Sequence, residues 1–232
     1  MPRHPAAVRL NLAPRTAGLV ADVRVDYKRE LGRCYSGTRT PVIIEIPELA
    51  FAMVDGLGDP NTSPAFSDAV GALYGVAYAA KFAVTQASGL TYAVMPLEGL
   101  WWTPEGRTFA AEDRSDWRWT VMIMQPAAVT ADLFAGACAQ AAARRPSDAV
   151  GRVRLDTYAE GWVAQVLHVG PYATEGPTIA GLHAFIADQG FVTNGKHHEI
   201  YLGDPRRAAP EKLKTIVRQP VVPRVGGGVD RG

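Results

Sequence analysis

The segment from His197 to Leu202, HHEIYL, combines residue types that could do acid–base or cation chemistry. Its composition predicts a short β-strand, which the turn signal Gly203-Asp204-Pro205 then ends. Because side chains alternate along a strand, Glu199 and Tyr201 share one face, whereas His198 and the apolar side chains share the other. A carboxylate beside a phenol on a strand can hold a cation, work as an acid–base pair, or simply lie in solvent. The strand alone leaves these three alternatives open.

The bulk composition is that of a globular protein in a reducing compartment. A chain of 232 residues with 47% apolar and 20% charged residues fits one large domain or two halves sharing a core. The net charge of +1 gives no field that would attract nucleic acid or an anionic membrane, and no apolar run approaches the roughly 20 residues of a membrane span. Cys34 and Cys138 lack a C-x-x-C pattern, which favours free thiols. We therefore expect a cytoplasmic protein with no direct nucleic-acid or membrane binding.

The chain divides into a folded region over residues 25–222 and a tail at each end. Residues 1–24 carry three prolines and little periodicity, so we expect a disordered or weakly ordered tail. Residues 223–232 are rich in glycine and are expected to be flexible. Within the folded region, the helix and strand signals fall into two halves, about 40–125 and 152–222.

Local signals give an element order in which strands and helices are separated by Gly, Pro and Asp clusters. We expect, in order, a short helix over Tyr27–Tyr35, a strand or bent strand pair over Pro41–Asp55, a helix started by Ser63-Pro64, an interrupted strand over Leu90–Trp102, a strand over Ser115–Gln125, a helix over residues 130–145 that joins the halves, a hairpin of Arg152–Tyr158 with Gly161–Val169, a helix from about Thr174, the strand from His197, and a last strand over Leu213–Val222.

The order strand, glycine turn, helix, strand, strand occurs once in each half. Both final strands also end in Gln-Pro, at Gln125-Pro126 and Gln219-Pro220. Two β-α-β-β units with antiparallel strands would form an α+β pseudo-dimer, with helices on one side of a curved sheet. Glu98 and Glu199 would then be approximate symmetry mates at a central cleft between the halves, where a ligand is expected to bind.

Several motifs together resemble the stand-alone GyrI-like small-molecule-binding proteins. They cover roughly Asp26 to Val222 and occur in order: DYKREL, IIEIPELAFAMVDGLGDPNTSPAF, ALYGVAYAAKF, MPLEGLWW, WRWTVMIMQP, HVGPYATE and HHEIYLGDPRRAAPEKLKTIVRQPV. The resemblance implies two SHS2-like β-α-β-β modules around a hydrophobic cleft, with a buried glutamate that meets the ligand. The family is related to ligand-sensing domains of MerR-type and AraC-type multidrug regulators. Only about 25 residues precede the fold here, too few for a helix-turn-helix domain.

The resemblance also implies an activity, because some stand-alone members hydrolyse the cyclopropane of DNA-alkylating, duocarmycin-like natural products. Opening a cyclopropane fused to a dienone needs a base that activates water and a donor near the carbonyl oxygen, which gains negative charge. Glu199 in an apolar cleft would have its pKa raised by desolvation toward a useful range for a base. Tyr201 or Tyr172 would be the donor, and Glu98 is a second candidate catalytic carboxylate.

The remaining candidate residues would hold the ligand. Aromatic rings bind flat aromatic molecules by offset stacking and cations through their faces, although some of these rings must fill the core. The expected ligand-binding residues are Trp101, Trp102, Trp119, Tyr74, Tyr78, Tyr172 and Glu175. Among them, Trp101 and Trp119 are predicted to line the cleft. No cofactor or metal is required, and His197 and His198 point to opposite faces, which makes them poor joint metal ligands.

Two functions from different classes are compatible with this pattern. The first is a detoxifying hydrolase, a cyclopropanoid cyclopropyl hydrolase that confers drug resistance by adding water to a hydrophobic aromatic substrate. The alternative is a non-catalytic binder that sequesters amphipathic drugs or modulates a protein partner such as DNA gyrase. A binder of cations needs only the carboxylate, whereas a hydrolase also needs a donor and room for water.

Overall fold

The computed structural model describes residues 23–104, 114 and 116–224. It is an α+β fold built on a large antiparallel sheet with the strand order β2-β8-β11-β10-β5-β6-β3-β7, where β9 pairs with β11 and a separate parallel pair joins β1 and β4. The strands are β1 (Val23–Val25), β2 (Val42–Ile46), β3 (Leu49–Leu57), β4 (Leu90–Tyr92), β5 (Leu97–Trp102), β6 (Arg118–Gln125), β7 (Arg154–Tyr158), β8 (Gly161–Val169), β9 (Phe191–Thr193), β10 (His197–Tyr201) and β11 (Lys214–Pro223). The helices are α1 (Tyr27–Glu30), η1 (Gly32–Cys34), α2 (Pro64–Ser88), α3 (Ala131–Arg144), α4 (Asp148–Gly151), η2 (Tyr172–Thr174), α5 (Gly176–Asp188) and η3 (Pro210–Lys212).

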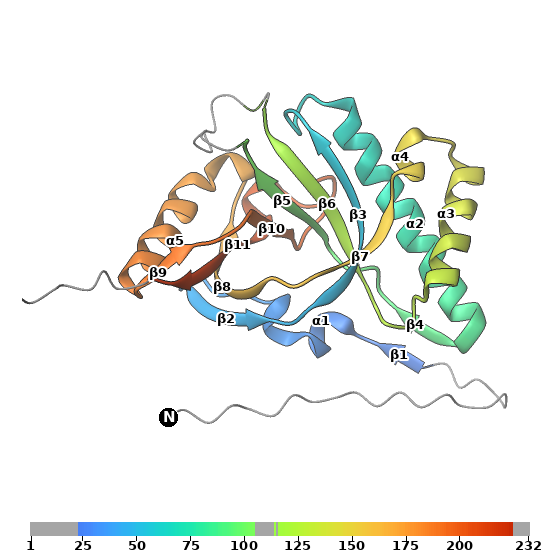
Figure 1. Ribbon diagram of the computed structural model, residues 1–232, viewed down its shortest axis with the longest axis horizontal. Helices are drawn as coiled ribbons and strands as arrows, with labels where there is room; N and C mark the ends of the chain where they lie inside the picture. Colours follow the sequence, from blue (N-terminus) through green and yellow to red (C-terminus); the bar gives the residue numbers. More distant parts are fainter. Residues whose placement is uncertain (1–22, 105–113, 115, 225–232) are drawn as a thin grey trace, which may run out of the picture.

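The long helix α2 begins where the sequence predicts. Ser63 is its N-cap residue, Pro64 lies in its first turn, and Gly89 ends it in the left-handed conformation with a φ of 68°. Its buried side chains are mostly small, such as Ala69 and Ala80, which lets α2 pack closely on β3 and β6. In Figure 1, α2, α3 and α4 gather at one end of the sheet and α5 at the other, with β5 and β10 between them.

The strand order is symmetric about the central pair β5 and β10. Outward from this pair come β6 and β3 on one side, and β11 and β8 on the other. In the pair itself, Glu199 lies opposite Gly99, and Ile200 lies opposite Glu98. The symmetric order is compatible with two β-α-β-β units, while their origin as a duplication stays a prediction.

The predicted hairpin of residues 152–169 is wrong. Strand β7 pairs with β3, and β8 pairs with β2 and β11, so β7 and β8 run on as one bent strand. Leu49 lies opposite Tyr158 and Ile46 lies opposite Gly161, so the pairing of β3 with β7 continues in the same register as the pairing of β2 with β8. The bent strand thereby links β2 and β7, the first and last strands in the order of the sheet. At this bend the side chain of Glu160 turns into the protein, where it is ion-paired with His198 and Arg218.

Other expected elements differ at their ends. The interrupted strand of residues 90–102 forms two separate strands, because β4 pairs with β1 whereas β5 joins the large sheet. The helix expected from Thr174 starts with the short η2, and α5 follows from Gly176. Most of the predicted N-terminal tail lies outside the described residues, although Val23 and Arg24 belong to β1. Of the C-terminal tail, residues 225–232 lie outside the described range. Within that range, no helix is both long and apolar enough to span a bilayer.

Candidate functional site

The helix-covered face of β10 presents His197, Glu199 and Tyr201 in a row. The two oxygens of Glu199 have different partners, because Oε1 lies 3.1 Å from His197 Nε2 and Oε2 accepts a 2.7 Å hydrogen bond from the Tyr201 hydroxyl. The Glu199 side chain keeps 15% of its surface exposed. This row, together with Tyr172 and Glu175, is called the seam site below.

Glycine at position 99 shapes the β5 side of the seam site. A β-carbon there would lie 2.8 Å from Nε1 of Trp101, so the indole fills the space that a side chain would need. Gly99 lies opposite Glu199 in the sheet, and the indole edge therefore lies beside this glutamate. The Trp101 Nε1 is buried and has no hydrogen-bond partner among the described residues.

Glu175 and Tyr172 reach the seam site from the segment that leads into α5. Glu175 is the N-cap residue of α5 and is only 5% exposed, yet its Oε1 has no hydrogen-bond partner within the described chain. The Tyr172 ring packs edge-on against Tyr201, with the ring centroids 5.5 Å apart, and is 39% exposed. The Thr215 hydroxyl of β11 lies near Glu175 but outside hydrogen-bonding geometry. Buried polar atoms without partners are uncommon, and each one calls for an explanation such as a bound water or a catalytic role.

The environment pushes the pKa values of the two glutamates in opposite directions. Burial, followed by the negative charge of Glu199, raises the pKa of Glu175 to about 8. Burial also opposes ionisation of Glu199, but the contacts with His197, Tyr201 and Glu175 outweigh it and lower the pKa of Glu199. The expectation that desolvation raises the Glu199 pKa is therefore wrong. At neutral pH the pair holds one proton, which Glu175 carries.

The tyrosine hydroxyls stay protonated over the same range. Burial and the nearby carboxylates raise the pKa of Tyr172 to about 12 and that of Tyr201 well above its ordinary value. The Tyr201 hydroxyl already donates to Glu199. Tyr172 is partly exposed and makes no side-chain hydrogen bond within the described residues, so it is the phenol better placed to meet a ligand.

The aromatic residues predicted to line a cleft divide into three groups. Trp101 and Trp119 lie on the helix-covered face but are buried, 4% and 0% exposed, and both contact Phe66 of α2. Trp102 points to the opposite face, where its ring stacks under the Lys196 ammonium at 3.5 Å. Tyr74 lies near Tyr172 and stacks on Tyr78, which is half exposed.

Glu98 does not join the seam site. It lies opposite Ile200, so its side chain points to the face of β10 that carries His198, away from Glu199. The expectation that Glu98 and Glu199 flank one cleft is wrong, because the antiparallel register places Gly99, not Glu98, opposite Glu199.

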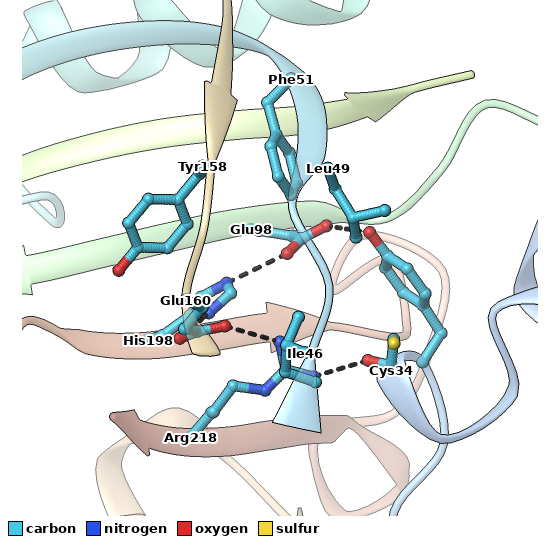
Figure 2. Close-up of a pocket in the computed structure, with 10 residues that line it drawn as sticks. Cys34, Ile46, Leu49, Phe51, Glu98, Tyr158, Glu160, His198 and Arg218 are labelled. Carbon is cyan, nitrogen blue, oxygen red and sulfur yellow. Dashed lines mark hydrogen bonds and ion pairs between the residues drawn. The ribbon is translucent and has the colours of Figure 1, made fainter. Parts of the chain in front are cut away.

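Glu98 instead belongs to a buried chain of charges, which is called the core network here (Figure 2). Its Oε1 accepts a 2.6 Å hydrogen bond from the Tyr35 hydroxyl, and its Oε2 lies 3.0 Å from His198 Nε2. The other His198 nitrogen lies 2.9 Å from Glu160, which also binds Arg218 at 3.0 Å. Arg218 further donates to the Cys34 carbonyl and to the Gln165 side chain, at 2.7 and 2.9 Å.

The core network is electrically balanced. Burial lowers the pKa of His198, but the charge of Glu160 and hydrogen bonds to Glu160 and Glu98 outweigh it and raise this pKa to about 9. Burial also opposes ionisation of Glu160, yet His198 and Arg218 lower its pKa. Two carboxylates thus meet two cations. The cavity beside them, about 10 Å³, has room for no more than one water molecule, so this region has the character of a structural core.

Sequence reasoning missed the parts of the site that come from tertiary contacts. It treated His197 only as a poor metal ligand, and it gave no role to Tyr35, Glu160 or Arg218. Strand parity was a usable signal for His197, since positions 197, 199 and 201 share a face.

The described residues hold no cluster of three or more His, Cys, Asp or Glu side chains suited to a metal. A larger cavity of about 170 Å³ lies between α2, α3 and α4, away from Glu199.

The fold and the seam site together define a small-molecule-binding protein built on one large antiparallel sheet. The family model of the GyrI-like small molecule binding domain matches residues 39–222, and the chain belongs to this family. An uncharacterized conserved protein from Listeria innocua is 39% identical with a TM-score of 0.79, and the match covers 85% of this chain and 100% of that one.

Two further solved structures, both hydrolases from Listeria innocua, are 38% and 37% identical to this chain, with TM-scores of 0.76 and 0.73. These matches cover 86% and 85% of this chain and the whole of each Listeria protein. A search of curated proteins found no significant match.

Proposed function

We propose that this protein is a hydrolase that adds water to reactive, cyclopropane-bearing aromatic compounds, and so detoxifies DNA-alkylating molecules. The observation that carries the proposal is the pair of glutamates in the seam site, one ionised and one with a pKa of about 8, beside partly exposed phenols. Neighbouring carboxyl groups whose pKa values are driven apart are a recurrent basis of acid–base catalysis. The similarity to two Listeria hydrolases supports the same class of activity.

In this mechanism Glu199 is the general base. It takes a proton from water while the water oxygen bonds to the cyclopropane CH2 carbon, and the carbon–carbon bond of the ring breaks. The electron pair of that bond moves through the dienone to its carbonyl oxygen, which becomes a phenolate. The Tyr172 hydroxyl donates a hydrogen bond to this oxygen, and protonation from solvent completes the phenol product.

Glu175 keeps the pair of glutamates at a single negative charge. With its proton in place, the substrate oxygen can gain negative charge beside one carboxylate rather than two. The unpartnered Glu175 Oε1 and Trp101 Nε1 add polar atoms that can orient water or substrate around Glu199. Glu98 has no part in this chemistry, since the sheet separates it from Glu199.

The second candidate function is non-catalytic sequestration of amphipathic drugs, or modulation of a partner such as DNA gyrase. One observation favours it: both Glu199 oxygens are already engaged, by His197 and Tyr201, as in a carboxylate fixed to meet a ligand's positive charge. Family membership by itself supports ligand binding and leaves turnover open.

The two candidates separate on the Glu199→Gln variant. Incubation with an activated cyclopropane substrate, followed through loss of the dienone absorbance, should show multiple turnovers for the natural protein. Glutamine keeps the shape and removes the base, so turnover should fall by roughly 10²–10⁴-fold, while binding of a neutral ligand stays within about a factor of ten. Sequestration predicts that the natural protein consumes at most one equivalent of the substrate. It also predicts that the Glu199→Gln variant no longer binds a cationic ligand. Full turnover by Glu199→Gln would exclude Glu199 as the base.

A further inference from the structure

One contact of the proposed base comes from its own strand. His197 lies two residues before Glu199, and neighbours at this spacing on a strand share a face. Its Nε2 is 3.1 Å from Glu199 Oε1, while Tyr201, two residues after Glu199, holds Oε2 at 2.7 Å. The carboxylate is thus fixed between two side chains of β10.

His197 is placed to hold this geometry rather than to meet a ligand itself. Its side chain is 8% exposed, compared with 15% for Glu199. It lies opposite Trp101 of β5 in the sheet. A short, buried side chain on a central strand has little freedom, so its contact with Glu199 costs little entropy to maintain.

From this geometry we infer that His197 is the positioning residue of the seam site, because it fixes Oε1 of Glu199 and keeps this carboxylate ionised as a base. The inference rests on the proposed function for its catalytic meaning, whereas the contact itself can be tested without turnover. In the sequence order His-x-Glu-x-Tyr, each oxygen of the Glu199 carboxylate then has its own hydrogen-bond donor, His197 for Oε1 and Tyr201 for Oε2. Loss of either donor should free the carboxylate to rotate and to pick up a proton more easily.

Other titratable groups also face Glu199 and must be separated from His197. Two of them, Glu175 and Tyr172, come from the segment that leads into α5, and the third, Tyr201, lies on β10 itself. His183 of α5 is near enough to His197 for burial and the His197 charge to lower the His183 pKa. His183 is exposed and makes no hydrogen bond with Glu199 within the described part of the chain, so it offers a matched control.

The test compares His197→Gln, His197→Leu and His183→Gln. The Glu199 pKa is measured by NMR of ¹³C-labelled glutamate side chains, with the signal assigned from its loss in Glu199→Gln. We expect His197→Leu to raise the Glu199 pKa by about one unit or more. His197→Gln can donate from nearly the same place and should restore at least half of that shift. His183→Gln should leave the Glu199 pKa within about 0.3 units of the natural protein.

Turnover gives the second readout. The acidic limb of the rate profile should move upward in His197→Leu by the same amount as the Glu199 pKa, with near-normal rates at higher pH. An unchanged Glu199 pKa in folded His197→Leu would overturn the inference, and so would equal shifts in the Gln and Leu variants. If the natural protein shows no turnover, the hydrolase proposal fails, but the NMR shift still decides whether His197 positions Glu199.

Discussion

The two faces of β10 carry the same kinds of ionisable group but differ in how completely these groups are buried and paired. In the core network, Glu98, His198 and Glu160 are 1–2% exposed and every carboxylate has a donor. In the seam site, Glu175 is buried and one of its oxygens has no partner among the residues that the structure describes, while Tyr172 reaches solvent. Buried polar groups that are fully paired make a structure rigid, whereas unpaired ones cost stability and persist where function needs them.

Burial of charge therefore does not by itself mark an active site. Both faces contain buried glutamates, and the more deeply buried one, Glu98, lies in the structural network. What separates the faces is how their carboxyl groups are neutralised. In the core network the cations His198 and Arg218 face Glu98 and Glu160, whereas in the seam site burial and the charge of Glu199 raise the pKa of Glu175 to about 8, so that this carboxyl holds a proton at neutral pH. Three experiments test this contrast between the two faces.

Removing Arg218 should have the largest effect on stability. Arg218→Met leaves Glu160 buried without its guanidinium partner, so the free energy of unfolding should fall by about 3–5 kcal/mol, measured by urea denaturation. The matched control is Arg154→Met, which breaks an exposed pair with Asp55 at 2.8 Å and should cost about 0–1 kcal/mol. Equal losses in the two variants would refute the structural role of the core network.

The second-largest loss of stability is expected when a rise in pH removes the proton of His198 in the core network. The pKa of His198 is about 9 in the folded protein and near 6.5 when unfolded. Its contribution is therefore complete below pH 6.5 and is lost as the pH rises through 9, amounting to up to about 3 kcal/mol. Thermal unfolding from pH 6 to 10 should show this fall, and His198→Gln should abolish the part between pH 6.5 and 9. A variant with the same slope as the natural protein would contradict this assignment.

The smallest effect concerns the cost of the seam site. Because the Glu175 pKa is about 8 in the folded state and near 4.5 when unfolded, this carboxyl opposes folding increasingly from pH 4.5 to 8. The pKa difference corresponds to about 5 kcal/mol at pH 8, but a buried glutamine amide without a partner costs up to about 3 kcal/mol. Glu175→Gln should then stabilise the protein by about 2 kcal/mol at pH 8 and not at pH 5, in urea denaturation at both values. In the proposed mechanism, ionisation of Glu175 above pH 8 would place a second negative charge near the reacting oxygen and slow turnover, and this decline should be absent in the same variant. A gain that is independent of pH would show that Glu175 does not carry the shared proton.

Much of the fold follows from local sequence signals. Ser63-Pro64 and Gly89 bound α2, and Thr130, whose hydroxyl accepts from the Leu133 amide, begins α3. The alternation in HHEIYL also determines that His197, Glu199 and Tyr201 share a face. These features depend on backbone conformation within a few residues, and the sequence specifies that directly.

The membership of each polar cluster depended on contacts that no local pattern contains. Glu98 was expected beside Glu199, but the β5–β10 register places it on the far face. Glu160-Gly161 was expected as a hairpin turn, but Glu160 turns inward to two cations that lie 38 and 58 residues further along the chain.

Strand periodicity is enough to predict which side chains of β10 lie together, because a strand alternates its faces with a period of two. That Glu175, rather than Glu98, completes the pair with Glu199 follows from the register of β5 against β10, since shifting one strand by a single residue moves each of its side chains to the other face of the sheet. Register is fixed by the packing of the whole sheet and of α5 against it, and not by the residues of either strand alone.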